Sequence, residues 1–225
     1  FGVGAQPSGD KDPFALRRAA LGVLRILIEK RVAAPLDGLV DAAFGTFVGV
    51  AAVKPDPQAL AGFLADRLRG HLREQGYTAN QVEAVLASGL DRVDLVPDRL
   101  AAVKAFEALP EADALAAANK RIVNILRKSG AESAAAVDRA LLAPGAEHDL
   151  WLTFQSLAPD VDAACGRGDW TAALRALATA KPVVDRFFDD VMVMADDPAV
   201  RGNRLALLAD VAATMNRVAD ISRLA

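Results

Sequence analysis

The sequence predicts an all-α fold arranged as a multi-helix bundle. Apolar residues recur at spacings of three and four along nearly all of the 225 residues, alanine is abundant, and the alternating β-branched pattern of strands is almost absent. Hydrophobic residues make up 53% of the chain and charged residues 24%, which is typical of a folded protein. The length is enough for one large hydrophobic core or two modest ones.

Two helices are expected in the N-terminal part. Asp12 can cap the first one and Pro13 suits its first position, where no backbone donor is needed. A second helix is expected from Leu36 to about Ala52, after which the KPDP sequence of residues 54–57 breaks the pattern. We place a domain boundary there, between residues 1–54 and 55–225. The predicted buried stripe of the first helix consists of Leu16, Ala20, Val23, Leu24, Leu27 and Ile28.

Beyond this boundary, capping residues, prolines and glycines mark where helices begin and end. These signals are glycine stops at Gly76 and Gly130, a capping box formed by Thr78 and Gln81, and prolines at the helix starts near Pro97 and Pro110. The helix that ends at Gly76 is expected to place Leu60, Phe63, Leu64, Leu68 and Leu72 on its core side.

Residues 131–180 are expected to form shorter helices, with turns near APGAE and GRGD and with Asp169 capping the helix that begins at Trp170. Two helices then complete the chain, from Pro182 to about Ala195 and from Pro198 to about Arg223. The first should bury Phe187, Phe188, Val191 and Met194, and carry Asp189, Asp190 and Val193 on a polar seam. Asp197 is expected to cap the last helix.

The sequence offers no convincing catalytic or metal site. His71 and His148 lack a second His or Cys at metal-binding spacing, and Cys165 is interpreted as a packing residue. The dipeptide His148–Asp149 resembles half of a metal-dependent phosphohydrolase signature, and the acidic pairs at 189–190 and 196–197 belong to different helices. We therefore expect no metal and no turnover. A hydrolase built on these groups is an alternative, and metal-dependent activity that is lost on changing both histidines would support it.

Charge and composition restrict the partners. The formal net charge is −3, so nucleic-acid binding requires local clusters of Lys and Arg. The single cysteine fits a reducing cytoplasm, and no apolar run approaches the length of a membrane span. The sequence begins at Phe1 without a signal-peptide pattern, which suggests a fragment.

Basic clusters are the most suggestive polar feature. In ANKRIVNILRKSG, residues 118–130, cations project from the side of a helix opposite its apolar stripe, and Asn119 and Asn124 carry amides that can read unstacked base edges. Arg67, Arg69, His71 and Arg73 form a similar cluster on an earlier helix. An ordinary solvated helix face is the alternative interpretation of each cluster.

Four segments together resemble one family, the bacterial glycyl-tRNA synthetase β subunit, in its C-terminal part. They are KDPFALRRAALGVLRILIEK, FLADRLRGHLREQGY, LAAANKRIVNILRK and VDRFFDDVMVMADDPAVRGNRLALLADVAATMNRVADISRLA. The resemblance covers essentially the whole chain. It implies that residues 1–54 end a helical HD-like domain and that residues 55–225 form an all-helical anticodon-binding region. The bundle from about residue 111 to 225 would then be of the DALR type shared with arginyl-tRNA synthetase.

The resemblance also implies a role in protein synthesis. In this family a separate α subunit forms glycyl-adenylate from glycine and ATP with Mg²⁺, and the β subunit binds and positions tRNA(Gly) for glycine–tRNA ligase activity. The expected assembly is a cytoplasmic heterotetramer of two α and two β chains. This chain would bind no DNA, membrane or cofactor of its own and would be non-catalytic by itself.

Candidate RNA contacts follow from the same resemblance together with the helix geometry. The leading ones are Lys120, Arg121, Asn124, Arg127 and Lys128. Secondary ones on the final helix are Arg201, Asn203, Arg204, Asn216 and Arg217. Lys11, Arg17 and Arg18 are candidates for the body of the tRNA. The alternative function is an all-helical protein-interaction module without RNA binding.

Overall fold

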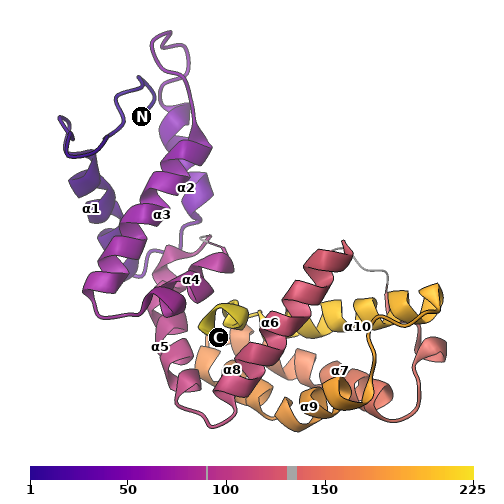
Figure 1. Cartoon of the computed structure of the whole chain (residues 1–225). Coiled ribbons are helices and arrows are strands. Elements are labelled where there is room, and N and C mark those ends of the chain that lie inside the picture. The colour runs from indigo at the N-terminus through magenta and orange to yellow at the C-terminus, as the bar shows by residue number, and fades with distance from the viewer. Residues whose placement is uncertain (90, 131–135) are drawn as a thin grey trace. The chain divides into compact units, whose positions relative to one another are not determined.

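The computed structural model describes residues 1–89, 91–130 and 136–225, and every regular element in these ranges is a helix (Figure 1). The all-α prediction is confirmed. The chain divides into two compact units, Phe1–Leu100 and Ala101–Ala225, which we call unit 1 and unit 2. Helix α5, Val96–Glu107, contains the point of division. None of the helices described is both long enough and apolar enough to cross a lipid bilayer.

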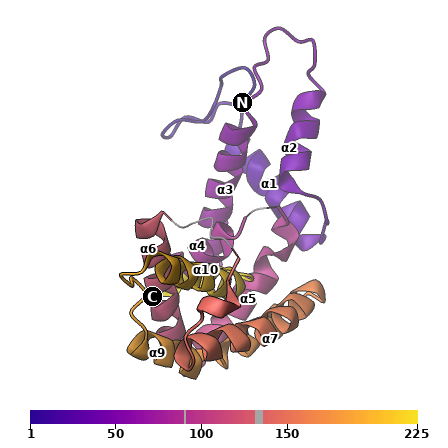
Figure 2. The same ribbon diagram turned by 90° about the vertical axis from the view of Figure 1, so that its right-hand side faces the viewer.

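Unit 1 is built around helix α3. Its elements are α1 (Leu16–Glu29), α2 (Leu36–Gly45), α3 (Pro57–Glu74), α4 (Ala79–Ala87) and η1 (Val93–Leu95). Helix α3 packs against α1, α2 and α4, as Figures 1 and 2 show for the first two. Leu24, Leu68 and Leu72 are completely buried between these helices. The boundary predicted after residue 54 therefore lies inside unit 1, between two helices that contact each other.

The start of α1 differs in detail from the sequence prediction. The Asp12 carboxylate does accept hydrogen bonds from the backbone N–H groups of Leu16 and Arg17, at 2.8 and 3.0 Å. The helix nevertheless begins at Leu16, because Ala15 has a left-handed backbone with φ 52°. Pro13 thus precedes the helix instead of opening it. The expectation that Val23 is buried was wrong, since its side chain is exposed.

Helix α2 is shorter than predicted and ends at Gly45 instead of near Ala52. Turn hydrogen bonds replace helical ones here: Phe47 donates to the Phe44 carbonyl and Val50 donates to the Phe47 carbonyl. Gly49 has φ 85°, which the right-handed helix does not allow. The apolar spacing in this segment resembles that of a helix, but the backbone at the glycine interrupts it.

The helix start and stop signals predicted around α3, α4 and α6 are confirmed. Gly76, with φ 92°, follows α3, and Gly130, with φ 67°, follows α6. Thr78 and Gln81 form the predicted capping box, in which the two reciprocal hydrogen bonds measure 3.0 and 3.2 Å. These signals are local, so they act without help from distant parts of the chain.

Unit 2 is a helical bundle. Its elements after α5 are α6 (Ala112–Ser129), η2 (Arg139–Leu141), α7 (Ala146–Gly166), α8 (Trp170–Ala178), α9 (Lys181–Asp190), α10 (Pro198–Met215) and η3 (Ile221–Leu224). Helix α7 packs against α8, α9 and α10, while α6 packs against α9, α10 and η3. Ile122, Leu150, Phe187 and Leu207 are among the buried side chains that join them.

The middle of unit 2 holds a longer helix than predicted. Helix α7 has 21 residues and continues through Pro159, whereas the sequence suggested shorter helices. The predicted turns on either side of it are confirmed, at Gly145 with φ 97° and Gly168 with φ 73°. Asp169 caps α8 as expected through a 3.0 Å hydrogen bond from the Ala172 N–H. The first five positions of the predicted segment, 131–135, lie outside the described residues.

Helix α9 ends at Asp190 instead of near Ala195, and residues 191–197 form a non-helical segment that we call the strap. Val193 is buried and Met194 is exposed, the reverse of the prediction. The reason is that the helix ends before these residues. Val191 already has an extended backbone, so the helical period no longer decides which side chains face the core. Asp197 caps α10 as predicted, but α10 ends at Met215 instead of near Arg223.

Candidate nucleic-acid interface

Helix α6 presents its cations on one face. At the helical rotation of about 100° per residue, the five leading candidates fall within an arc of about 120°. They are Lys120, Arg121, Asn124, Arg127 and Lys128, and the four cationic side chains among them are exposed. The opposite face carries Leu115, Ile122 and Leu126, which are buried. The amphipathic pattern of α6 therefore directs positive charge away from the core of unit 2.

Among the residues that the structure describes, these cations form no ion pair with a carboxylate. Lys120 donates to the Ala225 carbonyl oxygen at 2.7 Å, and Arg127 donates to Asn124 Oδ1 at 2.9 Å. As far as the described carboxylates are concerned, their charge therefore remains available for an anionic partner such as a phosphate.

Arg121 has a different environment from its neighbours on α6. Its guanidinium carbon lies 4.2 Å from the centroid of the Phe188 ring, which comes from α9. This distance is that of a cation–π contact. The aromatic ring of Phe188 therefore makes the environment of Arg121 partly apolar.

Asn119, by contrast, belongs to the interior. Its side chain is buried, and its Nδ2 donates to Asn216 Oδ1 at 2.6 Å. The same Asn216 oxygen accepts the Ile221 N–H at 3.1 Å. These amides join α6 to the segment after α10, so they stabilise the bundle and do not face a ligand.

The secondary candidates on α10 also make internal contacts. Asn203 is buried, accepts the Asp138 N–H at 2.7 Å and donates to the Asp138 carbonyl at 3.0 Å. Arg204 pairs with Glu147, whose side chain is only 1% exposed, and also donates to the Met192 carbonyl at 2.7 Å. These side chains connect α10 to η2, α7 and the strap.

Arg201 and Arg217 lie nearer the surface and have partners there. Arg201 donates to the Ala195 carbonyl at 2.8 Å, which ties it to the strap. Arg217 is exposed and pairs with Asp162 at 2.6 Å. Exposed pairs of this kind are weak, so Arg217 can exchange its partner at little cost.

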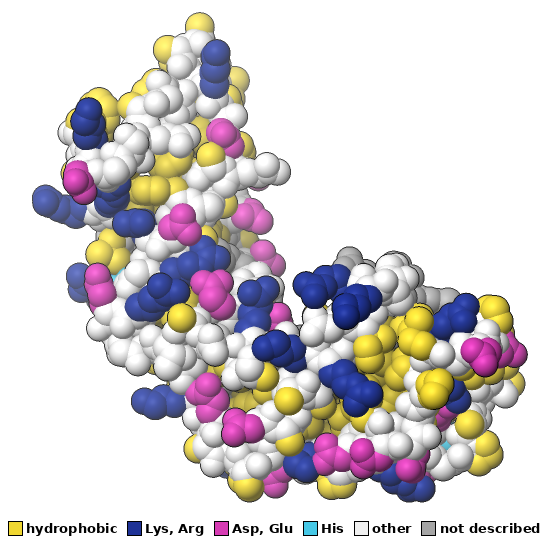
Figure 3. Space-filling view, viewed as in Figure 1, with side chains coloured by type: hydrophobic (Ala, Val, Ile, Leu, Met, Phe, Trp, Pro, Cys, Tyr) yellow, Lys and Arg dark blue, Asp and Glu magenta, His cyan; other side chains and the backbone are white. Residues whose placement is uncertain are grey.

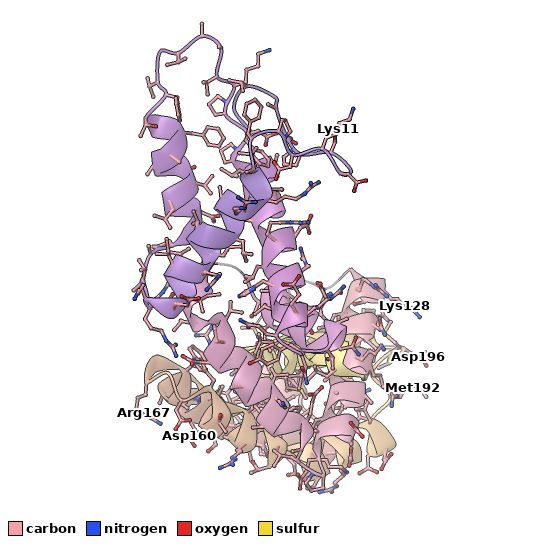
Figure 4. The ribbon with its side chains drawn as sticks, turned by 90° about the vertical axis from the view of Figure 1, so that its left-hand side faces the viewer. Lys11, Lys128, Asp160, Arg167, Met192 and Asp196 are labelled. Atoms are coloured by element: carbon pink, nitrogen blue, oxygen red, sulfur yellow. The ribbon has the colours of Figure 1, made fainter. Side chains whose placement is uncertain are left out.

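Two basic clusters predicted separately come together in unit 1. Arg17 and Arg18 from α1 and Arg67 and His71 from α3 line a hollow of ≈270 Å³. Glu74 also lines it, so the charge is mixed. Arg69 instead pairs with Asp66 and Glu83, and Lys11 projects away from the helices (Figure 4).

The groups considered for a hydrolase do not form one site. Asp149 pairs with Arg186 at 2.8 Å, while the His148 ring lies beside Trp151. Asp197 is used as the α10 cap. Within the ranges described, no three His, Cys, Asp or Glu side chains converge as metal ligands would.

Comparison with protein families gives two matches that together account for most of the chain. Residues 1–87 match the family model described as glycyl-tRNA synthetase beta subunit. Residues 115–221 match the DALR anticodon binding domain, a range that contains the whole cationic face of α6.

Curated relatives match over the full length of the chain. Glycine--tRNA ligase beta subunits of Ralstonia nicotianae and Dechloromonas aromatica are each 53% identical to it, over 225 and 224 residues, and that of Thiobacillus denitrificans is 54% identical over 233. The chain belongs to the glycyl-tRNA synthetase beta subunit family. It spans 32% of the length of each of these relatives.

The exposed part of the strap in this beta subunit family member does not follow from the sequence prediction. Val191, Met192, Val193 and Met194 alternate between more and less buried positions, and the two methionines are exposed. The alternation of valine and methionine is itself a period-two signal. It was hidden because the same residues also fit an extension of helix α9.

Proposed function

We propose that this chain is the tRNA-binding part of a glycine–tRNA ligase β subunit and that the α6 face contacts tRNA(Gly). The observation that supports this best is the set of exposed cations on one face of α6, inside the part of the chain that matches an anticodon-binding domain. No carboxylate among the described residues pairs with them. Lysine and arginine neutralise phosphates and release counterions, which drives binding.

In this proposal the chain positions RNA and performs no chemistry. Lys120, Arg127 and Lys128 contact phosphates of the anticodon loop, and Asn124 is close enough to them to contact a base edge. A separate α subunit, using ATP and Mg²⁺, forms glycyl-adenylate and transfers glycine. Two α and two β chains form the cytoplasmic ligase, and Lys11, Arg17 and Arg18 of unit 1 approach the body of the tRNA.

The main test measures affinity against salt. The full-length subunit is titrated with tRNA(Gly) and a non-cognate tRNA at several salt concentrations. Lys128→Ala should weaken binding and lower the slope of log K against log salt by about 0.7 to 0.9 if one phosphate contact is lost. Arg167→Ala is the matched control, since this exposed arginine projects from the opposite side of unit 2 (Figure 4).

A second test uses the complete enzyme. Replacing both Lys120 and Arg127 with alanine should reduce aminoacylation at limiting tRNA, because the tRNA is then positioned less often. Unchanged aminoacylation would contradict the placement of the RNA face on α6. A complete absence of tRNA binding at low salt would instead favour the all-helical protein-interaction module.

A further inference from the structure

The strap holds two large apolar side chains in solvent. Met192 is 76% exposed and Met194 is 53% exposed, while Val193 between them is buried and anchors the segment. Neighbouring exposed apolar side chains are unfavourable in water unless they serve an interaction. The Met192–Met194 pair therefore identifies a candidate contact surface of unit 2.

The strap is fixed by specific hydrogen bonds. Arg204 donates to the Met192 carbonyl at 2.7 Å, and Arg201 donates to the Ala195 carbonyl at 2.8 Å. Arg204 is fixed in turn by the buried Glu147. The methionine backbone is thus ordered before any partner binds, which lowers the entropic cost of binding.

Aromatic and basic groups border the two methionines. Phe188 precedes Met192 by four residues and stacks with Arg121 of α6. Lys128 and Met192 project from the same side of unit 2 in Figure 4. The space-filling view shows hydrophobic side chains with Lys and Arg beside them on unit 2 (Figure 3). An apolar surface with a cationic border fits a partner that combines flat apolar groups with negative charge.

We propose that Met192, Met194 and the Arg121–Phe188 stack form a platform for unstacked bases of the RNA loop whose phosphates α6 binds. This inference rests on the proposed function and extends it to base contacts. Base faces pack on aromatic rings and guanidinium planes, and the polarisable methionine sulfur adds to such contacts. Bases in a double helix are already stacked, so the platform selects single-stranded loop nucleotides.

The test compares Met192→Ala/Met194→Ala with Lys128→Ala in the full-length subunit, using an anticodon stem-loop RNA and a duplex of the same stem. The double methionine variant should bind the stem-loop about 3- to 30-fold more weakly and keep the parental salt slope. Lys128→Ala should lower that slope. Leu152→Ala, which removes another exposed apolar side chain of unit 2, should change neither property.

A cycle with modified RNA locates the contact. Each loop nucleotide in turn is replaced by an abasic one, and the affinity loss caused by the methionine substitutions is measured again. The loss should disappear for the one or two nucleotides that lie on the platform, because their contact is already absent.

The outcomes separate this inference from the proposed function. If Lys128→Ala weakens binding and the methionine variant does not, the platform is refuted while tRNA binding by α6 stands. An equal loss for stem-loop and duplex, or for every abasic RNA, would also overturn the platform. If the parental subunit binds no RNA, or neither variant weakens binding, the proposed function itself fails.

Discussion

Helices α6 and α10 carry similar polar residues and use them differently. Both contain arginine and asparagine at spacings that suggested RNA contact, yet α6 exposes its cations and α10 uses Asn203 and Arg204 inside the bundle. The side chains are alike, so the difference comes from what packs around each helix. A basic or amide-rich helix is available to a ligand only on a face that no other element covers.

The packing of α10 explains why its polar groups are used internally. Leu205, Ala206, Leu207 and Leu208 are consecutive and all buried, so α10 has core on more than one side. Helix α6 instead has a single buried stripe. Polar residues on a helix surrounded in this way must find protein partners, because an unpaired buried polar group is costly.

The sharpest test of this difference is Arg204→Ala. The substitution removes the partner of Glu147 and leaves a buried carboxylate without a counter-charge. We expect unit 2 to lose about 3 to 5 kcal/mol of unfolding free energy. Both tryptophans, Trp151 and Trp170, lie in unit 2, so denaturant unfolding followed by tryptophan fluorescence reports on this unit.

Adding Glu147→Gln to Arg204→Ala serves as the control. Removing the uncompensated charge should recover part of the lost stability, because the amide is less costly to bury than the carboxylate. A loss below about 1 kcal/mol for Arg204→Ala, which is the range of surface pairs, would mean that α10 resembles α6 after all.

Asn203→Ala on α10 should have the next largest effect. Both hydrogen bonds to the Asp138 backbone are lost, and we expect a loss of about 1 to 3 kcal/mol in the same fluorescence assay. Asn124→Ala on α6 is the matched substitution and should cost less than about 0.5 kcal/mol, since the side-chain hydrogen bond of Asn124 found among the described residues goes to an exposed arginine. Equal losses at the two positions would contradict the comparison.

Asp210 provides the smallest effect and the one that depends on pH. Partial burial raises the pKa of this largely exposed α10 carboxyl above its usual range, so ionisation is slightly disfavoured in the folded chain. The free-energy penalty for folding with an ionised Asp210 is absent below the pKa that Asp210 has in the unfolded chain. It grows as the pH rises from there through the raised pKa of the folded chain, and it is constant at higher pH. Asp210→Asn should therefore stabilise unit 2 at neutral pH by less than about 0.5 kcal/mol and leave it unchanged at pH near 3. Stabilisation that is equal at both pH values would indicate another cause.

Much of the fold was predictable because its signals are local. The Thr78–Gln81 capping box, the glycine after α6 and the Asp197 cap depend on atoms a few residues apart. The end of α9 was not predictable in this way, since the apolar residues 191–194 also fit a continuation of the helix. Interactions with Arg201 and Arg204 hold the strap in the form observed.

The sequence by itself determined the all-helical class, the family and the amphipathic face of α6, because periodicity and motif order depend only on the order of the residues. Only the tertiary structure decided which polar residues are free. Segments distant in the sequence supply hydrogen-bonding or ionic partners to Asn119, Asn203 and Arg204, so these side chains point inward. In contrast, Lys128 faces solvent, and an arginine of another helix holds the backbone of Met192 so that its side chain is also exposed. Hydrogen-bonding and charge requirements are met in space, and the spacing of residues along a helix does not reveal what lies opposite them.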